Sequence, residues 1–272
     1  MPELAALLPM VALLLVIGAF AGVIAGLLGV GGGIVLVPAF FYAFGHLGYG
    51  GGQLMQVCVA TSLATIVFTS VRSVLAHNRK GAVDWAILRG WAPFIVAGAI
   101  LGVLAASSLK SAALQAIFGA LGLGVGLYMA FGRADWRLGQ AMPGGAARVV
   151  LAGSVGFVSV LMGIGGGTFG VPLMSLYAVP IHRAVATASG FGILIALPSV
   201  IGFLLLPVAD GPPYTVGAVN LPAFLIVMAT TVTTTPWGVR LAHAMDPKPL
   251  KRVFALFLTI IALNMLRKAA GW

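Results

Sequence analysis

The 272-residue chain is 61% hydrophobic and only 7% charged, and its mean hydropathy is +1.12. An ordinary soluble domain cannot bury so much apolar surface, so the composition excludes a water-soluble protein and predicts one embedded in membrane lipid. The net charge of +10 does not indicate a nucleic-acid partner. Most Lys and Arg residues lie in short loops between apolar segments, as the positive-inside rule predicts.

The first apolar segment runs from Leu4 to Leu28 without a charged residue. It is too long for a signal peptide, and Glu3 stands where a basic region is expected, so we predict a retained first span. Helix-length apolar segments then continue through the chain, which predicts an all-α polytopic membrane protein with about eight to ten transmembrane segments. The segments cover residues 7–28, 33–45, 54–76, 85–106, 111–131, 147–162, 168–180, 185–207, 217–242 and 250–270.

Two glycine runs interrupt this apolar sequence. Residues 29–38 read GVGGGIVLVP, and residues 163–172 read GIGGGTFGVP. Glycine readily leaves helical geometry, and the segments that follow, 33–45 and 168–180, are too short to cross a bilayer as helices. We therefore predict a short broken helix after each run.

The two glycine runs belong to an internal repeat. An offset of 134 residues places Gly31 to Gly33 on Gly165 to Gly167 and Pro38 on Pro172. After a Gly-rich insertion around residues 46–52, the repeat continues with 60–64 on 186–190 and with 81–84 on 217–220. A repeat over most of both halves predicts two homologous membrane units, residues 1–132 and 148–272, joined by a cytoplasmic linker at 133–147.

Charge predicts how the two halves are oriented. The loop with Arg79 and Lys80 is basic, whereas its counterpart at 207–214 contains only Asp210. Conversely, residues 107–111 carry one Lys, whereas their counterpart at 243–252 carries two Lys and one Arg. In the first pair of equivalent loops the first half carries more positive charge, and in the second pair the second half does. The halves are therefore expected to be inverted repeats with the basic loops in the cytoplasm. Both termini then lie outside, where Arg267 and Lys268 depart from the rule.

A helix that restarts inside the membrane presents unpaired N–H groups and the positive end of its dipole, which together form an anion site. The predicted donors are the amides of 32–35 in the first run and of 166–169 in the second, which include those of Ile34 and Thr168. With inverted halves, both restarts point at one central cavity. The alternative is that glycines only let helices pack closely, and we prefer that interpretation for Gly18, Gly22 and Gly26.

Hydroxyl side chains give the next signal. Thr61, Thr65 and Thr69 share one helix face, and Ser62, Thr187 and Ser189 occupy related positions in the two halves. These hydroxyls could donate to an oxyanion, or they could bond back to the carbonyl four residues earlier. The run Thr230–Pro236 places several hydroxyls, including those of Thr234 and Thr235, beside the helix breaker Pro236. This run predicts a locally opened backbone at a cavity or hinge.

Few charged groups are candidates for the site. Arg183 and Arg72 could supply a positive charge to an anion or could reach lipid headgroups. Gln56 and His182 align between the halves and are expected to face one central volume from opposite ends. No carboxylate lies clearly inside a span, so His182 or His77 would be a weak substitute for the usual proton-coupling residue.

The sequence contains no catalytic set. It has no Walker motif and no serine with compatible His and Asp, so we predict that the protein is not an enzyme. A membrane-embedded enzyme is the rival class, and it would need a motif that the chain lacks. No His or Cys cluster predicts a metal or cofactor, and Cys58 is expected to be a packing residue.

The twin motifs at 26–38 and 159–172, followed by Ala-Thr-Ser at 60–62 and Ala-Thr-Ala-Ser-Gly at 186–190, resemble the TauE/SafE sulfite exporter family, also called the toluene-sulfonate uptake permease family. The resemblance covers essentially the whole chain. It implies a multi-pass carrier of a bacterial cytoplasmic (inner) membrane that transports sulfite, sulfoacetate or a related organosulfonate. It marks the motif glycines, Pro38, Pro172, Thr61, Ser62, Thr187 and Ser189.

The residue patterns and the resemblance together predict a secondary transporter. We expect alternating access around a central anion site, coupled to a proton or a sodium ion. The rivals within this class are a channel and a carrier of another small anion such as a carboxylate. The predicted substrate-binding residues are Gly31, Gly32, Gly33, Ile34, Gln56, Thr61, Ser62, Gly165, Gly166, Gly167, Thr168, His182, Arg183, Thr187 and Ser189. The predicted hinge or cavity-lining residues are Pro38, Pro172, Thr234, Thr235 and Pro236.

Overall fold

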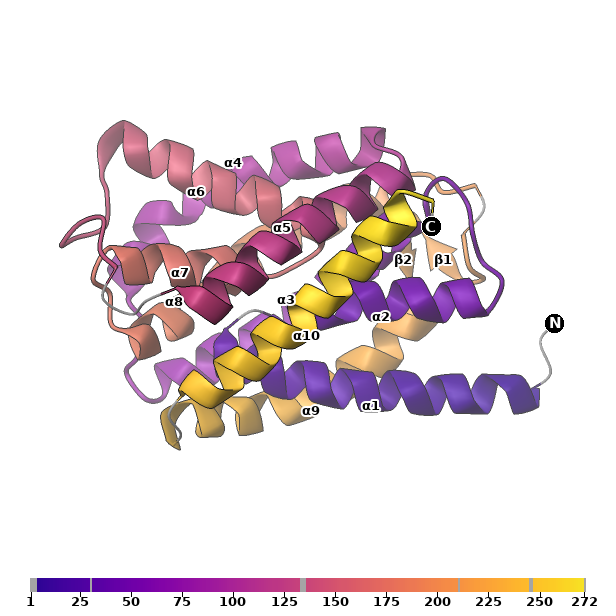
Figure 1. Cartoon of the computed structure of the whole chain (residues 1–272), viewed down its shortest axis with the longest axis horizontal. Coiled ribbons are helices and arrows are strands. Elements are labelled where there is room, and N and C mark those ends of the chain that lie inside the picture. Colours follow the sequence, from indigo (N-terminus) through magenta and orange to yellow (C-terminus); the bar gives the residue numbers. More distant parts are fainter. Residues whose placement is uncertain (1–3, 30, 133–135, 210, 245–246, 272) are drawn as a thin grey trace.

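The computed structural model describes residues 4–29, 31–132, 136–209, 211–244 and 247–271, with backbone only at 4–7 and 247–254. The predicted linker therefore begins outside the described residues, as does Asp210. Within them the chain forms ten helices and one small antiparallel ribbon (Figure 1). The helices are α1 (Leu4–Leu28), α2 (Gly33–His46), α3 (Leu54–Asn78), α4 (Trp85–Ser108), α5 (Ser111–Phe131), α6 (Gly145–Met162), α7 (Gly167–Leu176), α8 (Ile181–Leu204), α9 (Leu221–Ala244) and α10 (Pro247–Ala269); the strands are β1 (Thr215–Val216) and β2 (Val219–Asn220).

Six of these helices, α1, α3, α4, α5, α6 and α8, are long and apolar enough to cross a membrane. Two shorter apolar helices, α2 and α7, follow the glycine runs, as predicted. Large apolar side chains such as Phe20, Leu104, Leu205 and Trp237 lie exposed on the outside of the bundle. An exposed apolar surface on a helical bundle is suited to lipid rather than to water. The predicted all-helical, multi-pass membrane class is confirmed.

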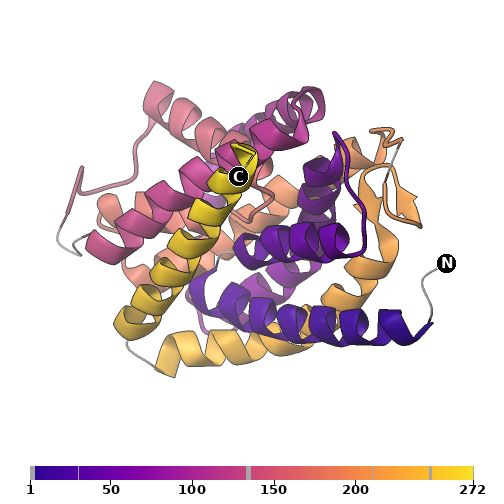
Figure 2. The same ribbon diagram turned by 45° about the vertical axis from the view of Figure 1, so that its right-hand side comes forward.

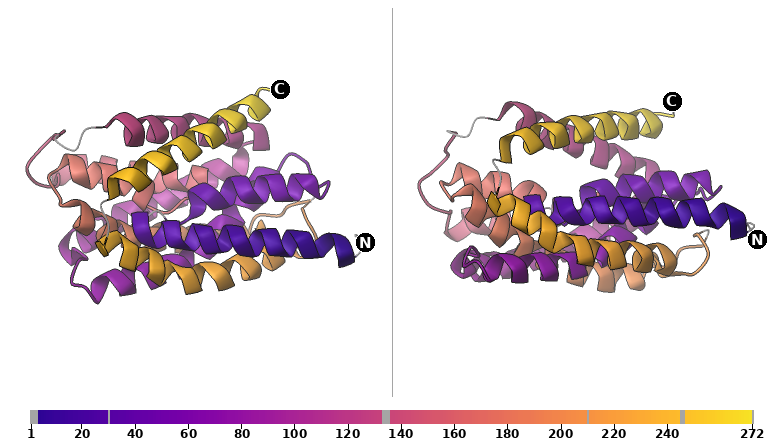
Figure 3. Two further views of the ribbon diagram at one scale, coloured as in Figure 1. Left: turned by 60° about the horizontal axis from the view of Figure 1, so that its bottom comes forward. Right: turned by 90° about the horizontal axis from the view of Figure 1, so that it is seen from below.

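Helices α3 and α8 form the centre of the bundle and pack against each other. Around them α1 packs on α9 and α4 on α6, while α5 packs on α10 (Figures 2 and 3). The short helices take corresponding places, because α2 packs on α3 and α7 packs on α8. Each half therefore contributes one central helix and one short helix beside it.

Small residues bring the peripheral helices close together. A side-chain carbon added at Gly22 of α1 would lie 2.7 Å from Thr231 Cα of α9, and one at Gly156 of α6 would lie 2.2 Å from Ile95 O of α4. Gly18 and Gly26 make similarly close contacts with α9. Side chains at these positions would force the helices apart, so the first-span glycine stripe serves packing, as predicted.

The bundle has two distinct ends. At one, which we call the histidine end, α3 and α9 finish and α8 begins, and His77, His182 and His243 gather there. At the other, which we call the strand end, α3 begins beside the loop that carries β1 and β2, and Gln53 Nε2 donates to Pro207 O at 3.4 Å. The histidine end is at the left of Figure 1 and the strand end at the right.

The run Thr230–Pro236 does not open the backbone. Helix α9 is continuous through it, and the hydroxyls of Thr231 and Thr235 donate to carbonyls four residues earlier at 2.8 Å and 2.6 Å. Thr234 Oγ1 also donates to Ala19 O of α1 at 2.9 Å. The expectation of an opened backbone was wrong because back-bonding and the contact with α1 satisfy these hydroxyls inside a regular helix.

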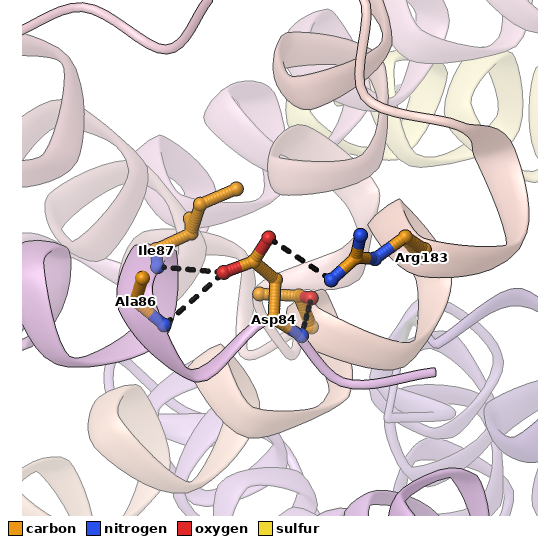
Figure 4. Close-up of polar contacts among 5 residues, drawn as sticks. Asp84, Ala86, Ile87 and Arg183 are labelled. Carbon is orange, nitrogen blue, oxygen red and sulfur yellow. Dashed lines mark hydrogen bonds and ion pairs between the residues drawn. The ribbon is translucent and has the colours of Figure 1, made fainter. Parts of the chain in front are cut away.

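Matched caps begin α4 and α9. Asp84 Oδ1 accepts from the N–H groups of Ala86 and Ile87, both at 3.1 Å (Figure 4). Asn220 Oδ1 accepts from Ala223 N–H at 3.1 Å in the corresponding position of the second half. These bonds satisfy amides that would otherwise be orphaned at each helix start.

Candidate functional site

The first glycine run breaks the chain between α1 and α2. Gly29, Gly31 and Gly32 have φ values of 67°, 74° and 80°, in the left-handed region that side chains disfavour. Gly32 O then accepts from Val35 N–H at 3.0 Å and from Leu36 N–H at 3.1 Å, which starts α2. The predicted break is confirmed at this run.

The second run breaks the chain between α6 and α7. Gly163 has φ 65° and ends α6, whereas Gly166 has ordinary helical angles of −62° and −12°. Gly166 O accepts from Gly170 N–H at 2.7 Å in the first turn of α7. The predicted break is confirmed here as well. Among the described glycines, one residue of this run has a left-handed backbone, whereas three do in the first run.

The two breaks touch, and we call their described residues, 29, 31–33 and 163–167, the glycine junction. A side-chain carbon added at Gly33 would lie 2.3 Å from Gly163 O, and one at Gly31 would lie 3.3 Å from Gly165 Cα. Ser62 Oγ of α3 donates to Gly163 O at 2.8 Å. From the junction α2 extends toward the strand end and α7 toward the histidine end (Figure 1). The positive end of α2 therefore contacts the segment that leads into the positive end of α7, inside the bundle.

The junction is buried and contains unpaired donors. The described residues of both runs and their neighbours up to Pro38 and Thr168 are buried. Within the described chain, no acceptor pairs with the N–H groups of Gly167 or Thr168. Val35, by contrast, is not free, because its N–H already bonds to Gly32 O. The available donors are thus fewer than the sequence predicted.

Two buried hydroxyls near the second break also have no partner among the described residues. These are Thr168 Oγ1 on α7 and Ser159 Oγ on α6, in residues that are 4% and 0% exposed. An unsatisfied buried polar group costs about 1–3 kcal/mol. Hydroxyl and amide donors beside a helix N-terminus are the groups that an oxyanion would satisfy.

The other predicted hydroxyls make structural bonds. Thr61 Oγ1 accepts from Asn220 N–H at 3.0 Å, and Thr187 Oγ1 accepts from Asp84 N–H at 2.9 Å, so the two threonines hold the capped starts of α9 and α4. Ser189 Oγ donates to Ala186 O at 2.6 Å within α8. Among the hydroxyls predicted to bind substrate, Ser62 and Thr168 lie at the junction. Substrate binding by the remaining three stays a prediction.

Gln56, His182 and Arg183 do not lie at the junction. Gln56 is buried at the strand end, where its Nε2 donates to Ala106 O at 3.4 Å and to Leu109 O. Arg183 lies at the histidine end, where Nη2 is 3.4 Å from Asp84 Oδ2 in a partly exposed ion pair (Figure 4). The structure thus places these predicted substrate residues at opposite ends of the bundle.

The three histidines form a chain of contacts at the histidine end. His77 Nε2 lies 3.2 Å from Gly26 O of α1, and His77 Nδ1 lies 3.2 Å from His243 Nε2 of α9. Because the carbonyl can only accept, His77 Nε2 carries a hydrogen and neutral His77 accepts from His243 through Nδ1. The His182 ring stacks on His243 with centroids 5.8 Å apart. Imidazoles therefore link α8, α9, α3 and the last turn of α1 before the first break.

Sequence reasoning missed the apolar neighbours of the junction. A side-chain carbon at Gly33 would meet Ile66 Cδ1 at 2.8 Å, and one at Gly166 would meet Phe191 Cβ at 2.3 Å. Nothing in sequence distinguishes these two residues from other apolar helix residues. Ser159 was identifiable, because it begins the second glycine motif. The described residues include no group of His, Cys, Asp or Glu that could hold a metal ion.

Comparisons with known proteins point to one family. The family described as Sulfite exporter TauE/SafE matches residues 14–265 of this chain. A probable membrane transporter protein of Haemophilus influenzae is 30% identical over 94% of this chain and 98% of its own length. A second, from Methanocaldococcus jannaschii, is 27% identical over 93% of this chain and 94% of its own, and one from Bacillus subtilis is 29% identical over 65% and 71%. No solved structure was found to match.

Proposed function

Because the chain belongs to the TauE/SafE sulfite exporter family, whose relatives here are membrane transporters rather than enzymes, we propose that it is a secondary carrier of sulfite, sulfoacetate or a related organosulfonate. The observation that carries this proposal is the glycine junction. Helices α2 and α7 both begin there, and the hydroxyl of Thr168 is buried without a partner among the described residues. A sulfur oxyanion presents several acceptor oxygens around one negative centre, so dispersed amides and hydroxyls can hold it without a fixed cation.

The proposed binding groups are those of the junction and its nearest side chains. The two breaks contact each other in this structure, so the solute enters as they separate. Thr61, Thr187 and Ser189 act in this proposal by positioning the helices around the site. The proposed substrate-contacting residues are Gly31, Gly32, Gly33, Ile34, Ser62, Gly165, Gly166, Gly167 and Thr168.

We propose that the halves are inverted repeats and that they exchange access by rocking against each other. The exchanged helix contacts support this arrangement, because α1 packs on α9 of the other half just as α6 packs on α4. The matched bonds from Thr61 to Asn220 and from Thr187 to Asp84 support it at the residue level. With basic loops inside, the histidine end faces the cytoplasm of a bacterial cell, and the strand end faces outward.

The residues at the two ends then belong to the two access routes. Gln56 is proposed to line the outer route, and His182 and Arg183 the inner one. Pro38 and Pro172 occupy the same position in α2 and α7, the sixth residue of each helix, and are proposed as flexing points. Thr234, Thr235 and Pro236 support this movement through the α1–α9 contact. A proton or sodium ion is proposed to drive transport.

Replacing Thr168 by Val tests the anion site. Val keeps the shape of Thr and removes a hydroxyl that bonds to no described group, so the protein should unfold at the same temperature or higher. Uptake of labelled sulfite and sulfoacetate into proteoliposomes should fall several-fold, because one donor to the solute is lost. The matched control is Ser199→Ala in α8, whose hydroxyl donates to Ile195 O at 2.7 Å, away from the junction.

The same assay compares substrate classes. Acetate serves as a carboxylate without sulfur, and we expect little uptake of it. Transport of acetate but not of sulfur oxyanions would reject the substrate class. Unchanged sulfur-oxyanion uptake by the Thr168→Val protein would remove that hydroxyl from the site.

A further inference from the structure

A second polar region lies far from the glycine junction, in a cavity of about 760 Å³ at the strand end. Its walls are the end of α2, the loop that follows it, the start of α5 and the end of α10 (Figure 1). The lining includes Phe41, Tyr42, Tyr49, Lys110, Gln115 and Lys268. We call this cavity the vestibule.

The loop that forms one wall is the Gly-rich insertion at 46–52, which the second half of the chain lacks. Gly48 and Gly51 have φ values of 81° and 125°, which side chains rarely adopt. Side-chain carbons added at Gly50 or Gly52 would meet nothing within 4 Å. The loop thus borders open space, and close packing does not account for its glycines.

The charges facing the vestibule are positive. Lys110 projects from the start of α5, and Lys268 Nζ lies 4.6 Å from the ring centre of Tyr42 and 5.3 Å from that of Phe41. Asp84 is the one carboxylate residue among those the structure describes, and it is paired with Arg183 at the other end of the bundle. Neither lysine therefore has a described acidic partner.

Unsatisfied donors accompany these cations. Tyr42 Oη is buried without a partner in the described structure. Gln115 is also buried, and its Nε2 donates to Ser111 Oγ at a long 3.4 Å. The end of α10 adds Arg267 next to Lys268, and under the proposed topology both lie outside, against the positive-inside rule. The positive-inside rule therefore does not explain why these two residues are basic.

We propose that the vestibule binds an oxyanion of the sulfonate or phosphate type, with Lys110, Lys268 and Tyr42 Oη as its donors. Its aromatic walls and lysines suit an anionic group joined to a small apolar body. The idea that a transported anion binds in the vestibule before or after it crosses the membrane rests on the proposed function. The idea that the vestibule binds an anion at all rests only on its geometry, and the experiment below tests that binding without measuring transport.

Charge-selective cysteine labelling tests the vestibule. The single native cysteine, Cys58, is buried, so the wild-type protein provides a background of low reactivity. Gly50→Cys places a reporter thiol in open space at the vestibule, and Gly144→Cys places a matched thiol at an exposed glycine near the other end. Each variant is treated in neutral detergent with anionic sulfonatoethyl methanethiosulfonate and with its cationic trimethylammonium counterpart.

The ratio of anionic to cationic labelling rates at Gly50→Cys should fall about fivefold or more when Lys110→Gln and Lys268→Gln are added. Arg at both positions should preserve the ratio, and the ratio at Gly144→Cys should not change. Sulfoacetate should slow anionic labelling at Gly50→Cys alone. An unchanged ratio after both Gln substitutions would overturn the proposal.

Vesicles separate the two sources of such an anion. If phosphatidylglycerol added to phosphatidylcholine vesicles protects Gly50→Cys and sulfoacetate does not, the site takes a lipid headgroup. Protection by sulfoacetate in phosphatidylcholine alone assigns it to a soluble anion. Protection by neither would contradict anion binding, and none of these results depends on whether the protein transports sulfite.

Discussion

The two glycine breaks look alike in sequence but are held differently. In the second, Ser62 Oγ donates to Gly163 O at 2.8 Å, a buried bond between groups that do not titrate. In the first, Thr69 Oγ1 reaches Gly31 O only at 3.4 Å, and the last turn of α1 is tied through Gly26 O to His77. The repeat aligns Ala188 with Ser62, so the second half has no hydroxyl at this position that could donate to the first break.

This difference indicates which break moves. A buried hydrogen bond to a backbone carbonyl fixes the second break to α3. The first break has no such short bond from α3, because its contacts are the long one from Thr69 and the indirect one through His77 and Gly26 O. We infer that the second break is the fixed side of the site and the first is the side that responds. Three substitutions, each with a matched control, test this inference.

The largest effect is expected from Gly33→Ala, which forces the breaks apart. The added carbon would lie 2.3 Å from Gly163 O and 2.8 Å from Ile164 Cα, and both are backbone atoms that cannot rotate away. Uptake should be lost, and the protein should be markedly destabilised, as overpacking typically costs about 1–3 kcal/mol. Gly45→Ala in the same helix is the control, because nothing lies within 4 Å there.

Gly45→Ala should leave uptake intact and stabilise α2 slightly, since Ala is the better helix former. Equal effects of the two Ala substitutions on uptake and thermal unfolding would mean that contact between the breaks is not required.

A smaller effect is expected from Ser62→Ala, which releases the fixed break. It leaves Gly163 O without this donor and should cost about 1–3 kcal/mol, measured as a lower midpoint of unfolding. Ser189→Ala removes only a bond within α8 to Ala186 O, so it should cost less. If both Ala variants unfold alike, Ser62 does not anchor the second break.

The sequence predicted the broken helices because glycine runs and short apolar segments act locally. It also named Ser62 and Thr168, which the structure places beside the breaks, and their binding of a substrate stays a prediction. It could not assign Thr61 and Thr187, because the Asn220 and Asp84 amides that they bind lie more than 100 positions away along the chain. Capping by Asp84 was readable, since an Asp directly before an apolar helix is a common N-cap.

The Thr230–Pro236 run misled because composition alone does not reveal where hydroxyls find partners. Several of them bond within α9, and the close approach of α1 at Gly18 and Gly22 occupies that face. The repeat also predicted that Gln56 and His182 face the site from opposite ends, and the structure places them at opposite ends of the bundle. The repeat could not show that both lie away from the junction, because sequence alignment carries no depth along the helices.

The smallest effect on stability is expected from His77→Gln, which tests the responsive break. Gln can still donate to Gly26 O, so the fold should persist, but the ring contact with His243 is lost. Uptake should fall a few-fold, because the end of α1 is then tied less firmly to α9. Ser199→Ala, which removes a bond within α8 only, should leave uptake unchanged. Wild-type uptake by the His77→Gln protein would separate the histidine end from the movement of the first break.

The central claim is that one oxyanion is held by the amides at the starts of both short helices. A density map of the wild-type protein saturated with sulfoacetate tests it most directly. We expect a sulfonate within hydrogen-bonding distance of the backbone nitrogens of Gly33 and Thr168, with the two breaks moved apart around it. A map in which the breaks stay in contact and the solute binds only elsewhere would contradict it.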